Sequence, residues 1–265
     1  MQINNNMTSN NISLVEQKQN NLLEKLASGK KVNNAQDDAA AQQIIDRLTT
    51  QVEGNRQAIK NVYDGISVAQ IAEGGLSTIN DNVNRVRELS LQSGSGILND
   101  SDRRAIQFEI TQLQKNIVQS IEQTNFAGKS LLLDAGSLEF QTGANANQSI
   151  SVNTQDVAAQ LNDVLAINIT SGTSVEDALN AADSALEGIG GARGEFGASL
   201  NRLESTARSL IKGNVNAAEA RSRIESVDYA QAASERAIND IRSQASLTVQ
   251  AQANQQQSQV ISLLS

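Results

Sequence analysis

A seven-residue repeat of aliphatic side chains between Ile45 and Ile66 constrains the fold more than any other feature of the chain. Its first position holds Ile45, Val52, Ile59 and Ile66, and its second, three residues further on, holds Leu48, Asn55, Val62 and Ala69. This period keeps both positions on one face of an α-helix, which another helix has to cover. Asn55, the one polar member, can fix the register at some cost in stability. The repeat predicts a coiled-coil-like seam.

The residue types that the chain lacks favour long, thin helices. Proline is absent from the 265 residues, so no helix has to be kinked or broken. Only six aromatic residues are available to anchor a thick core. Small aliphatic residues suit helix–helix seams. We therefore expect a mainly α fold, built as a long antiparallel helical bundle.

The composition also excludes classes of function. Without histidine or cysteine there is no thiol chemistry and no histidine-based nucleophile or zinc site. We expect no catalytic residue, no metal site and no cofactor. The net charge of −8 argues against nucleic-acid binding. No apolar stretch approaches the ~20 residues that span a bilayer, and we expect no cleavable signal peptide at Met1.

The two ends of the chain are nearly free of charge. Residues 1–23 carry only Glu16 and Lys18, and residues 243–265 carry no charged side chain. A disordered polar tail is one interpretation of such ends. Spaced apolar residues favour amphipathic helices that pair with each other and build a polymer; the residues expected there are Leu22, Leu26, Ile238, Ile241, Val260, Leu263 and Leu264.

The segment between the repeat and residue 128 reads as a helical hairpin. The sequence Ser93-Gly-Ser-Gly96 breaks the first helix, and Asn99, Asp100 and Ser101 are candidates for the N-cap of the next. An apolar face recurs from Ile106 to Ile121. This helix is expected to end at residues 124–128.

Residues 129–173 change character. Apolar and polar residues alternate over 138–142 and again over 150–154, with a turn at 143–148, which predicts a β-hairpin. Residues 167–170 are expected to form another short strand. A helix resumes after Ser174, with Asp177 three residues further on as in a weak capping box. Five glycines from Gly188 to Gly197 weaken that helix, and close approach of a neighbouring helix would explain them.

The acidic pair Asp37-Asp38 could suggest acid–base or metal chemistry. Adjacent residues on a helix do not face each other. A role in a turn or at a helix start is the expected one.

Motifs along nearly the whole chain resemble those of bacterial flagellins, the subunits of the flagellar filament. They comprise LASGKKVN (26–33), DDAA (37–40), NVYDGISVAQIAEGG (61–75), NRVRELS (84–90), TNFAG (124–128), NRLES (201–205), ARSRIE (220–225), DYA (228–230), AQAN (251–254) and VISLL (260–264). Each motif is weak alone, but their joint order and spacing are specific.

The resemblance implies a division of the chain into layers. Residues 1–32 and 231–265 would form the filament core domain, and residues 33–128 and 174–230 an outer helical layer. Residues 129–173 would be the β-hairpin insert, so the chain would be a minimal flagellin without large outer domains. It would be exported to the extracellular filament through the flagellar channel and would polymerise with itself.

The resemblance also implies contact residues and partners. The segment of Arg85, Glu88 and Leu89, with Glu109, is similar to the part of flagellins that forms subunit contacts and is recognised by a flagellin-sensing Toll-like receptor of vertebrates. An ordinary solvated helix face is the alternative. An export chaperone of flagellin, the hook-junction proteins and the filament-cap protein are further implied partners.

Three other functions deserve comparison. A hook–filament junction protein shares the terminal helices, but the density of motifs on both sides of the insert favours a flagellin. An enzymatic insert of the metalloprotease kind needs an HExxH motif, and the chain has no histidine. An extracellular coiled-coil adhesin would form discrete oligomers instead of filaments.

Overall fold

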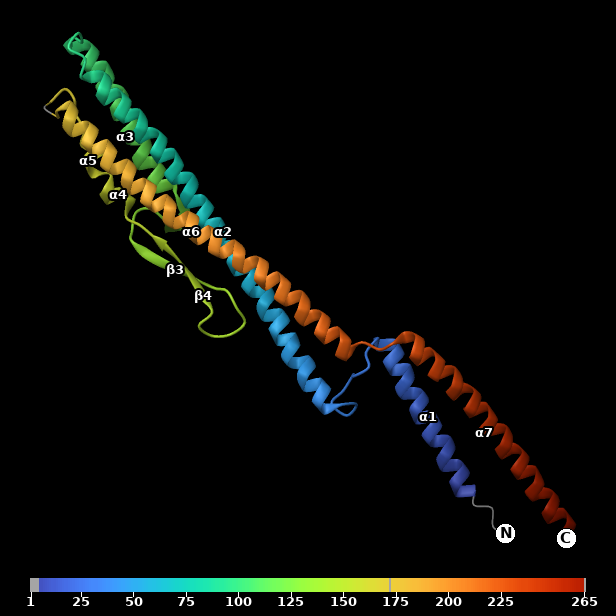
Figure 1. The fold of residues 1–265 in the computed structure, drawn as a ribbon. Coiled ribbons are helices and arrows are strands. Elements are labelled where there is room, and N and C mark those ends of the chain that lie inside the picture. The colour runs from blue at the N-terminus through green and yellow to red at the C-terminus, as the bar shows by residue number, and fades with distance from the viewer. Residues whose placement is uncertain (1–4, 172, 265) are drawn as a thin grey trace. The chain divides into compact units, whose positions relative to one another are not determined.

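The computed structural model describes the backbone of residues 5–171 and 173–264, and the side chains of residues 14–171, 173–249, 251, 252, 255 and 256. The helices are α1 (Asn5–Ser28), α2 (Ala39–Ser93), α3 (Asp100–Gln123), α4 (Val157–Gln160), α5 (Asn162–Leu165), α6 (Val175–Glu225) and α7 (Tyr229–Leu264) (Figure 1). The strands are β1 (Asn125–Phe126), β2 (Lys129–Ser130), β3 (Gly136–Gln141) and β4 (Ser149–Thr154). The expected mainly helical fold class is confirmed.

The chain divides into two compact units. The terminal unit comprises Met1–Gln51 with Val215–Ser265, and the central unit comprises Val52–Asn214. Each unit is described by itself below.

The central unit has a continuous apolar core between α2, α3 and α6. Apolar residues spaced by three and four positions bury one face of each helix. On α3 the buried residues are Ile106, Ile110, Ile117 and Ile121. Phe196 on α6 and Leu76 on α2 are among the largest side chains that the core encloses. The three helices therefore bury a continuous core against one another, and Leu91, Ile97 and Phe108 remain exposed on its surface.

Helix α3 begins where the sequence predicts. The Asn99 side chain accepts hydrogen bonds from the backbone N–H of Ser101 at 2.8 Å and Asp102 at 2.9 Å. The Asp102 carboxylate accepts one from the N–H of Asn99 at 3.1 Å, which completes a capping box. Arg103 Nη1 donates to the carbonyl of Ser93 at 2.6 Å and so ties the start of α3 to the end of α2.

The β elements are two small antiparallel hairpins. Ala127 and Gly128, with φ of 49° and 79°, form the turn between β1 and β2, where positive φ at both positions is what a type I′ turn requires. In the predicted β3–β4 hairpin, Leu138 pairs with Val152 and Phe140 with Ile150. Asn61 Nδ2 of α2 donates to the carbonyl of Gln141 at 3.0 Å, which anchors this hairpin on α2.

The expected strand at residues 167–170 is wrong. The backbone N–H of Ile169 donates to Gln107 Oε1 at 2.8 Å, and the carbonyl of Ile167 accepts from Gln114 Nε2 at 3.0 Å. Two side-chain amides of α3 thus satisfy backbone groups that a neighbouring strand would otherwise have bonded. Ile167 and Ile169 are nevertheless buried, which explains the alternating pattern.

The explanation offered for the glycine run on α6 is also wrong. A Cβ atom at Gly188 would meet only the flexible side chain of Gln160, and one at the other four would have no described atom within 4 Å; these are Gly190, Gly191, Gly194 and Gly197. Among the described residues, only the side chain of Gln160, the last residue of α4, would come within 4 Å of a Cβ atom at any of these positions. The structure gives no reason for these glycines.

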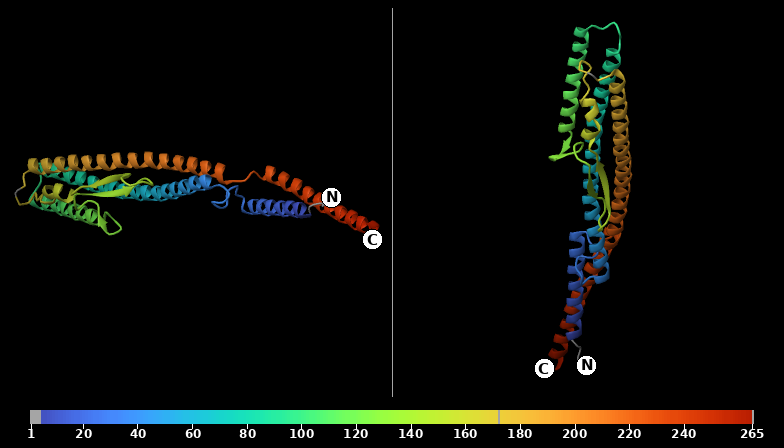
Figure 2. Two further views of the ribbon diagram at one scale, coloured as in Figure 1. Left: turned by 90° about the horizontal axis from the view of Figure 1, so that it is seen from below. Right: turned by 90° about the vertical axis from the view of Figure 1, so that its left-hand side faces the viewer.

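In the terminal unit, α1 and α7 lie side by side in both views of Figure 2. Gln19 hydrogen-bonds Asp240, and the Tyr229 hydroxyl donates to the carbonyl of Leu26 at 3.2 Å. The residue facing Gln19 is Asp240, and the residue facing Leu26, further along α1, is the earlier Tyr229. The two helices are therefore antiparallel. The expected pairing of the two ends is confirmed.

Candidate functional site

Among the described side chains of the α1–α7 pair, most large apolar ones are only partly buried or exposed. Of the predicted core-tube residues, Leu22 and Leu26 are half-buried, whereas Ile238 and Ile241 are 46% and 67% exposed. The side chains of three others, Val260, Leu263 and Leu264, lie outside the described residues. Further exposed apolar side chains on the pair are Leu14, Leu23, Leu247 and Val249. Rows of such residues mark surfaces that another molecule covers.

A short clasp closes one end of this pair. Lys31 N–H donates to the carbonyl of Glu225 at 2.6 Å, and Val227 N–H donates to the carbonyl of Gly29 at 3.1 Å. The ammonium of Lys30 lies 2.7 Å from Glu225 Oε1. Gly29, with φ of 70°, ends α1 in the left-handed conformation that glycine adopts without strain. The clasp therefore fixes where the two terminal helices enter their pairing.

Asp37 and Asp38 serve local backbone geometry, as predicted. Asp38 Oδ1 accepts from the N–H groups of Ala40 and Ala41 at the start of α2. Asp37 Oδ2 accepts from the N–H of Asn33 at 3.0 Å, and Lys25 lies 3.7 Å from its other oxygen. The hydrogen bond from Asn33 is the main cause that holds the pKa of Asp37 below its ordinary value of 3.8.

Arg85 is the centre of a charged cluster on the surface of the central unit. Its guanidinium donates to Glu109 Oε1 of α3 at 3.0 and 2.8 Å, and to Glu88 Oε2 at 3.0 Å. These hydrogen bonds, above all those to Glu109, raise the pKa of Arg85. The sequence analysis assigned these three residues to one contact surface, and the structure places them in contact.

Leu89 does not belong to the exposed part of that cluster. Its side chain is 2% exposed and packs in the core. The expectation that it shares a surface with Arg85 is therefore corrected. Four positions advance a helix by slightly more than one turn, which is enough here to carry Leu89 across the boundary between solvent and core.

The predicted seam residues occupy the inner face of α2. Ile45 and Val52 are 5% and 3% exposed, and Ile59 and Ile66 are half-buried. Asn55 is 8% exposed. Arg193 of α6 pairs with Glu73 of α2 at 2.8 Å, and Arg87 of α2 with Asp183 of α6 at 2.6 Å. Sequence reasoning missed both pairs, because more than ninety positions separate the partners in each.

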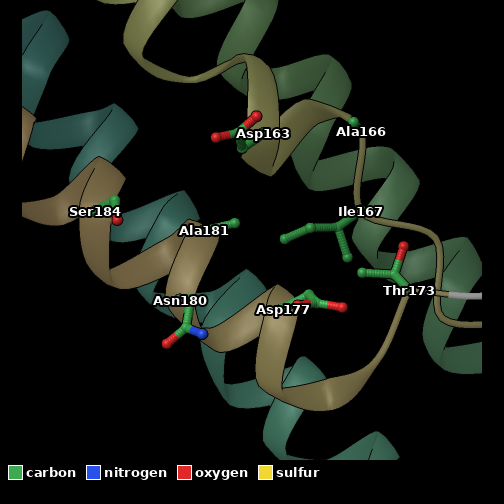
Figure 3. A pocket seen from close by; sticks show the side chains of 8 residues that line it. All are labelled: Asp163, Ala166, Ile167, Thr173, Asp177, Asn180, Ala181 and Ser184. Carbon is green, nitrogen blue, oxygen red and sulfur yellow. The ribbon is translucent and has the colours of Figure 1, made fainter.

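Two surface hollows were also missed. One, of about 580 Å³, lies in the terminal unit between α1 and α7 and is lined by Lys18, Lys25, Lys31 and Arg223 among others. The other, of about 370 Å³, lies in the central unit between α5, the segment that follows it and α6 (Figure 3). Their residues come from separated segments, and no local motif marks them.

The arrangement offers contact surfaces. Over the side chains that the structure describes, no group of three or more carboxylates could hold a metal ion. No helix among the described residues is long and apolar enough to cross a membrane.

Two family models match the chain. Residues 1–137 match the bacterial flagellin N-terminal helical region, and residues 179–264 match the bacterial flagellin C-terminal helical region. Only residues 138–178 lie between the matched parts.

Two relatives match along most or all of their length. Flagellin of Bacillus subtilis (strain 168) is 38% identical, and the match covers 100% of both chains. Flagellin of Halalkalibacterium halodurans is 36% identical over 91% of this chain and 90% of its own. The chain therefore has no large domain inserted between the two matched regions.

Solved structures agree in fold. The crystal structure of Bacillus cereus flagellin matches with a TM-score of 0.52 at 25% identity, over 57% of this chain and 88% of that chain. A putative flagellar hook-associated protein from Vibrio parahaemolyticus matches with a TM-score of 0.63, over 72% of this chain and 100% of its own. Because its identity is only 15%, that likeness concerns the fold alone.

Proposed function

This chain belongs to the bacterial flagellins, the subunits that polymerise into the extracellular filament of the flagellum, and we propose that its α1–α7 pair supplies the surface that joins successive subunits. The observation that carries the proposal is the exposed apolar surface of this pair. Ile241 is 67% exposed and Val249 is 63% exposed. Both lie on α7, a helix with few charged side chains that could be hydrated. A surface of this kind is costly in a free monomer and is removed from water when subunits stack.

The driving force would be burial of apolar area, at about 25 cal/mol per Å². Stable interfaces between proteins bury above ~1,000 Å² in total. A contact between two different surfaces of the same chain generates an open helical polymer when the rotation from one copy to the next does not close a ring. No chemical step is needed, and the polymer itself is the propeller for swimming.

The layered division expected from the sequence is proposed for the assembled filament. Residues 1–32 and 231–265 would line the filament core, with residues 33–128 and 174–230 outside them. Residues 129–173 would form the insert on the outer layer. The exposed apolar side chains of α1 and α7 support this order, since a core position would cover them.

We further propose the Arg85 cluster as a subunit contact and as the patch that a flagellin-sensing Toll-like receptor would recognise. Arg85, Glu88 and Glu109 are exposed and mutually hydrogen-bonded, so a partner would meet a preformed charged surface. Burial removes Leu89 from this surface. We expect Arg85→Ala to slow filament growth while leaving the melting temperature nearly unchanged. Normal growth of the variant, followed by light scattering, would remove the cluster from the interface.

The remaining partners are proposed from the family. An export chaperone would bind the C-terminal helix, and the hook-junction and filament-cap proteins would contact the two ends of the polymer. Exposed apolar residues of α7, such as Leu247 at 54%, are the kind that a chaperone shields before assembly.

The deciding experiment is negative-stain microscopy of purified monomer seeded with short filament fragments. It is run beside a chain that lacks residues 1–30 and 235–265. Uniform helical filaments from the full chain alone are the expected result. Discrete small oligomers from both proteins would show that the terminal helices are not the joining surface.

A further inference from the structure

The turn of the β3–β4 hairpin holds two asparagines in uncharged surroundings. Asn145 and Asn147 lie between Gln141, the last residue of β3, and Ser149, the first residue of β4 (Figure 1). Both are exposed, and residues 140–155 include no charged side chain. Neither side-chain amide makes a hydrogen bond within the described part of the chain. Both carboxamides are therefore open to reaction. We call residues 142–148 the hairpin turn.

The carboxamide of an asparagine can be attacked by the backbone nitrogen of the residue that follows it. That nitrogen forms a bond to Cγ, the side-chain nitrogen leaves as ammonia together with the proton of the attacking N–H, and a cyclic succinimide remains. Water then opens the ring at either carbonyl, which gives aspartate or isoaspartate and adds one negative charge. Because the attack is intramolecular, its rate depends on how freely the two reacting atoms can meet.

The attacking nitrogens of the hairpin turn are free. The N–H groups of Ala146 and Gln148 donate no hydrogen bond within the described residues. The bonds that close the turn use other atoms. Thr142 N–H donates to the carbonyl of Gln148 at 2.7 Å, and Gln141 Nε2 donates to the carbonyl of Asn145 at 2.6 Å. The turn is thus closed without engaging either nucleophile.

Asn147 is also unrestrained at its own backbone. With φ of 64° it lies in the left-handed region, which asparagine enters more readily than most other residues. Neither its N–H nor its carbonyl is hydrogen-bonded to a described residue. No hydrogen bond therefore has to break before its backbone rotates toward its side chain.

The same dipeptide recurs on α6, where the helix blocks the reaction. Asn180-Ala181 and Asn216-Ala217 repeat the pair Asn145-Ala146, and all three asparagines are exposed. Within α6 the N–H groups of Ala181 and Ala217 bond to the carbonyls four residues earlier. Attack there requires the helix to open locally. Dipeptide and exposure are matched among the three sites, and the backbone is what differs.

A further copy of the dipeptide, Asn34-Ala35, lies in the turn before α2. It is exposed, but the carboxylate of Asp37 accepts a hydrogen bond from the N–H of Asn34 at 3.3 Å. The attacking nitrogen has to lose its proton, so negative charge would develop close to that carboxylate, which disfavours it. The hairpin turn contains no carboxylate, and the reaction should be faster there.

We propose that Asn145 and Asn147 form a site of spontaneous deamidation, with water as the only co-reactant. The inference concerns the folded chain and does not depend on polymerisation. Each event adds a carboxylate to a segment that has no charge. Isoaspartate also adds a methylene to the main chain, inside a turn that places Ala144 so close to α2 that an added Cβ atom at Gly54 would lie 2.7 Å from its Cβ. Modification should therefore loosen the contact between the hairpin turn and α2.

The test incubates the full-length protein under native conditions and, in parallel, in concentrated guanidinium chloride. Peptide mapping by mass spectrometry measures, at each asparagine, the gain in mass that replacement of NH₂ by OH produces. In the native protein, Asn145 and Asn147 should react at least about tenfold faster than Asn180 and Asn216, because the helical amides are released only by local opening. In the denatured chain, the rates at Asn145, Asn180 and Asn216 should agree within about threefold, since the structural difference is then lost.

Two variants complete the design. Asn145→Gln with Asn147→Gln removes the site, because glutamine would have to form a larger ring, and modification of the turn should disappear. Asn180→Gln is the matched control on α6 and should leave the rate at the turn unchanged. Circular dichroism confirms that both variants are folded.

Three results would overturn the proposal. They are equal native rates at the turn and on α6, a native difference that persists in the denatured chain, and a faster native rate at Asn34 than at Asn145. Each rate is measured on the monomer, so a failure to form filaments would count against the proposed polymerisation alone.

Discussion

The central unit and the α1–α7 pair are built from similar amphipathic helices but end with different surfaces. In the central unit three helices meet, and Phe196, Leu76 and Ile110 are almost wholly enclosed. The α1–α7 pair has only two helices, and Ile241 and Leu247 remain more than half exposed. Two helices cover one stripe of each other, and a third element is needed to cover the rest. The central unit is therefore stabilised by its own contacts, whereas the α1–α7 pair leaves apolar surface that other copies of the chain would cover.

The largest expected effect tests the self-sufficiency of the central unit. Phe196→Ala should lower the free energy of unfolding by about 3–5 kcal/mol, because it leaves a cavity where a 1% exposed ring had packed. Phe108→Ala is the control, since that ring is 68% exposed, and it should change the value by less than about 0.5 kcal/mol. Urea denaturation measures both. Equal effects would mean that the core is not closed around Phe196.

A neighbouring pair of glycines tests how tightly the same unit is packed. A Cβ atom at Gly75 would lie 2.8 Å from Cγ2 of Thr124, which is only 6% exposed, whereas one at Gly74 would have nothing described within 4 Å. Gly75→Ala should destabilise by about 1–3 kcal/mol through overpacking. Gly74→Ala should stabilise by about 0.5–1 kcal/mol through helix propensity. Thermal unfolding measures the change in stability for both variants. A change in the same direction for both would contradict the assigned packing.

The terminal pair should show the opposite behaviour. Ile241→Ala with Val249→Ala should hardly change the stability of the monomer, since both side chains face water there. The critical concentration for polymerisation should rise by about tenfold, because the filament loses apolar area that it would bury. Ile97→Ala, at a 92% exposed position of the central unit, serves as the comparison and should leave the critical concentration unchanged. A critical concentration that responds only to Ile97 would reverse the roles of the two regions.

The smallest effect concerns the clasp region of the terminal unit. The pKa of Asp37 is lowered, chiefly by the hydrogen bond from Asn33, so its ionised form is favoured by folding. Its contribution is complete above the unfolded value near 3.8 and is lost as the pH falls through the lower folded value. An NMR titration of the Asp37 carboxyl carbon should have its midpoint below 3.8. A midpoint at or above that value would remove the hydrogen bond from Asn33 as a cause.

Local chemistry could be predicted from the sequence, and the contacts between distant segments could not. The Asn99 cap, the β3–β4 hairpin and the pairing of the ends follow from signals within a few residues or from matched composition. The Arg87–Asp183 pair depends on how two helices meet across many intervening positions. Residues 167–170 have the alternation of a strand, but the side chains that satisfy their backbone lie 53 and 62 positions away on α3.

The candidate site shows the same limit at the scale of one side chain. The hypothesis grouped Arg85 with Leu89 because helical neighbours four apart share a face. That rule does not predict where the boundary between core and solvent falls on the helix, and this boundary lies between Arg85 and Leu89. The two surface hollows could not be predicted for a related reason, since each is lined by single residues from segments that have no common motif.

The contacts at the turn between α2 and α3 have a consequence for how fast the chain can fold. The capping box of Asn99 and Asp102 and the bond from Arg103 to Ser93 join residues no more than ten positions apart. Closing such short loops costs little chain entropy, so this hairpin can form early, whereas pairing α2 with α6 must close a far longer loop. A chain that starts unfolded would then build the central unit outward from this turn and add α6 later. The sequence separation between contacting residues would thus set the order in which the parts fold, without any partner molecule.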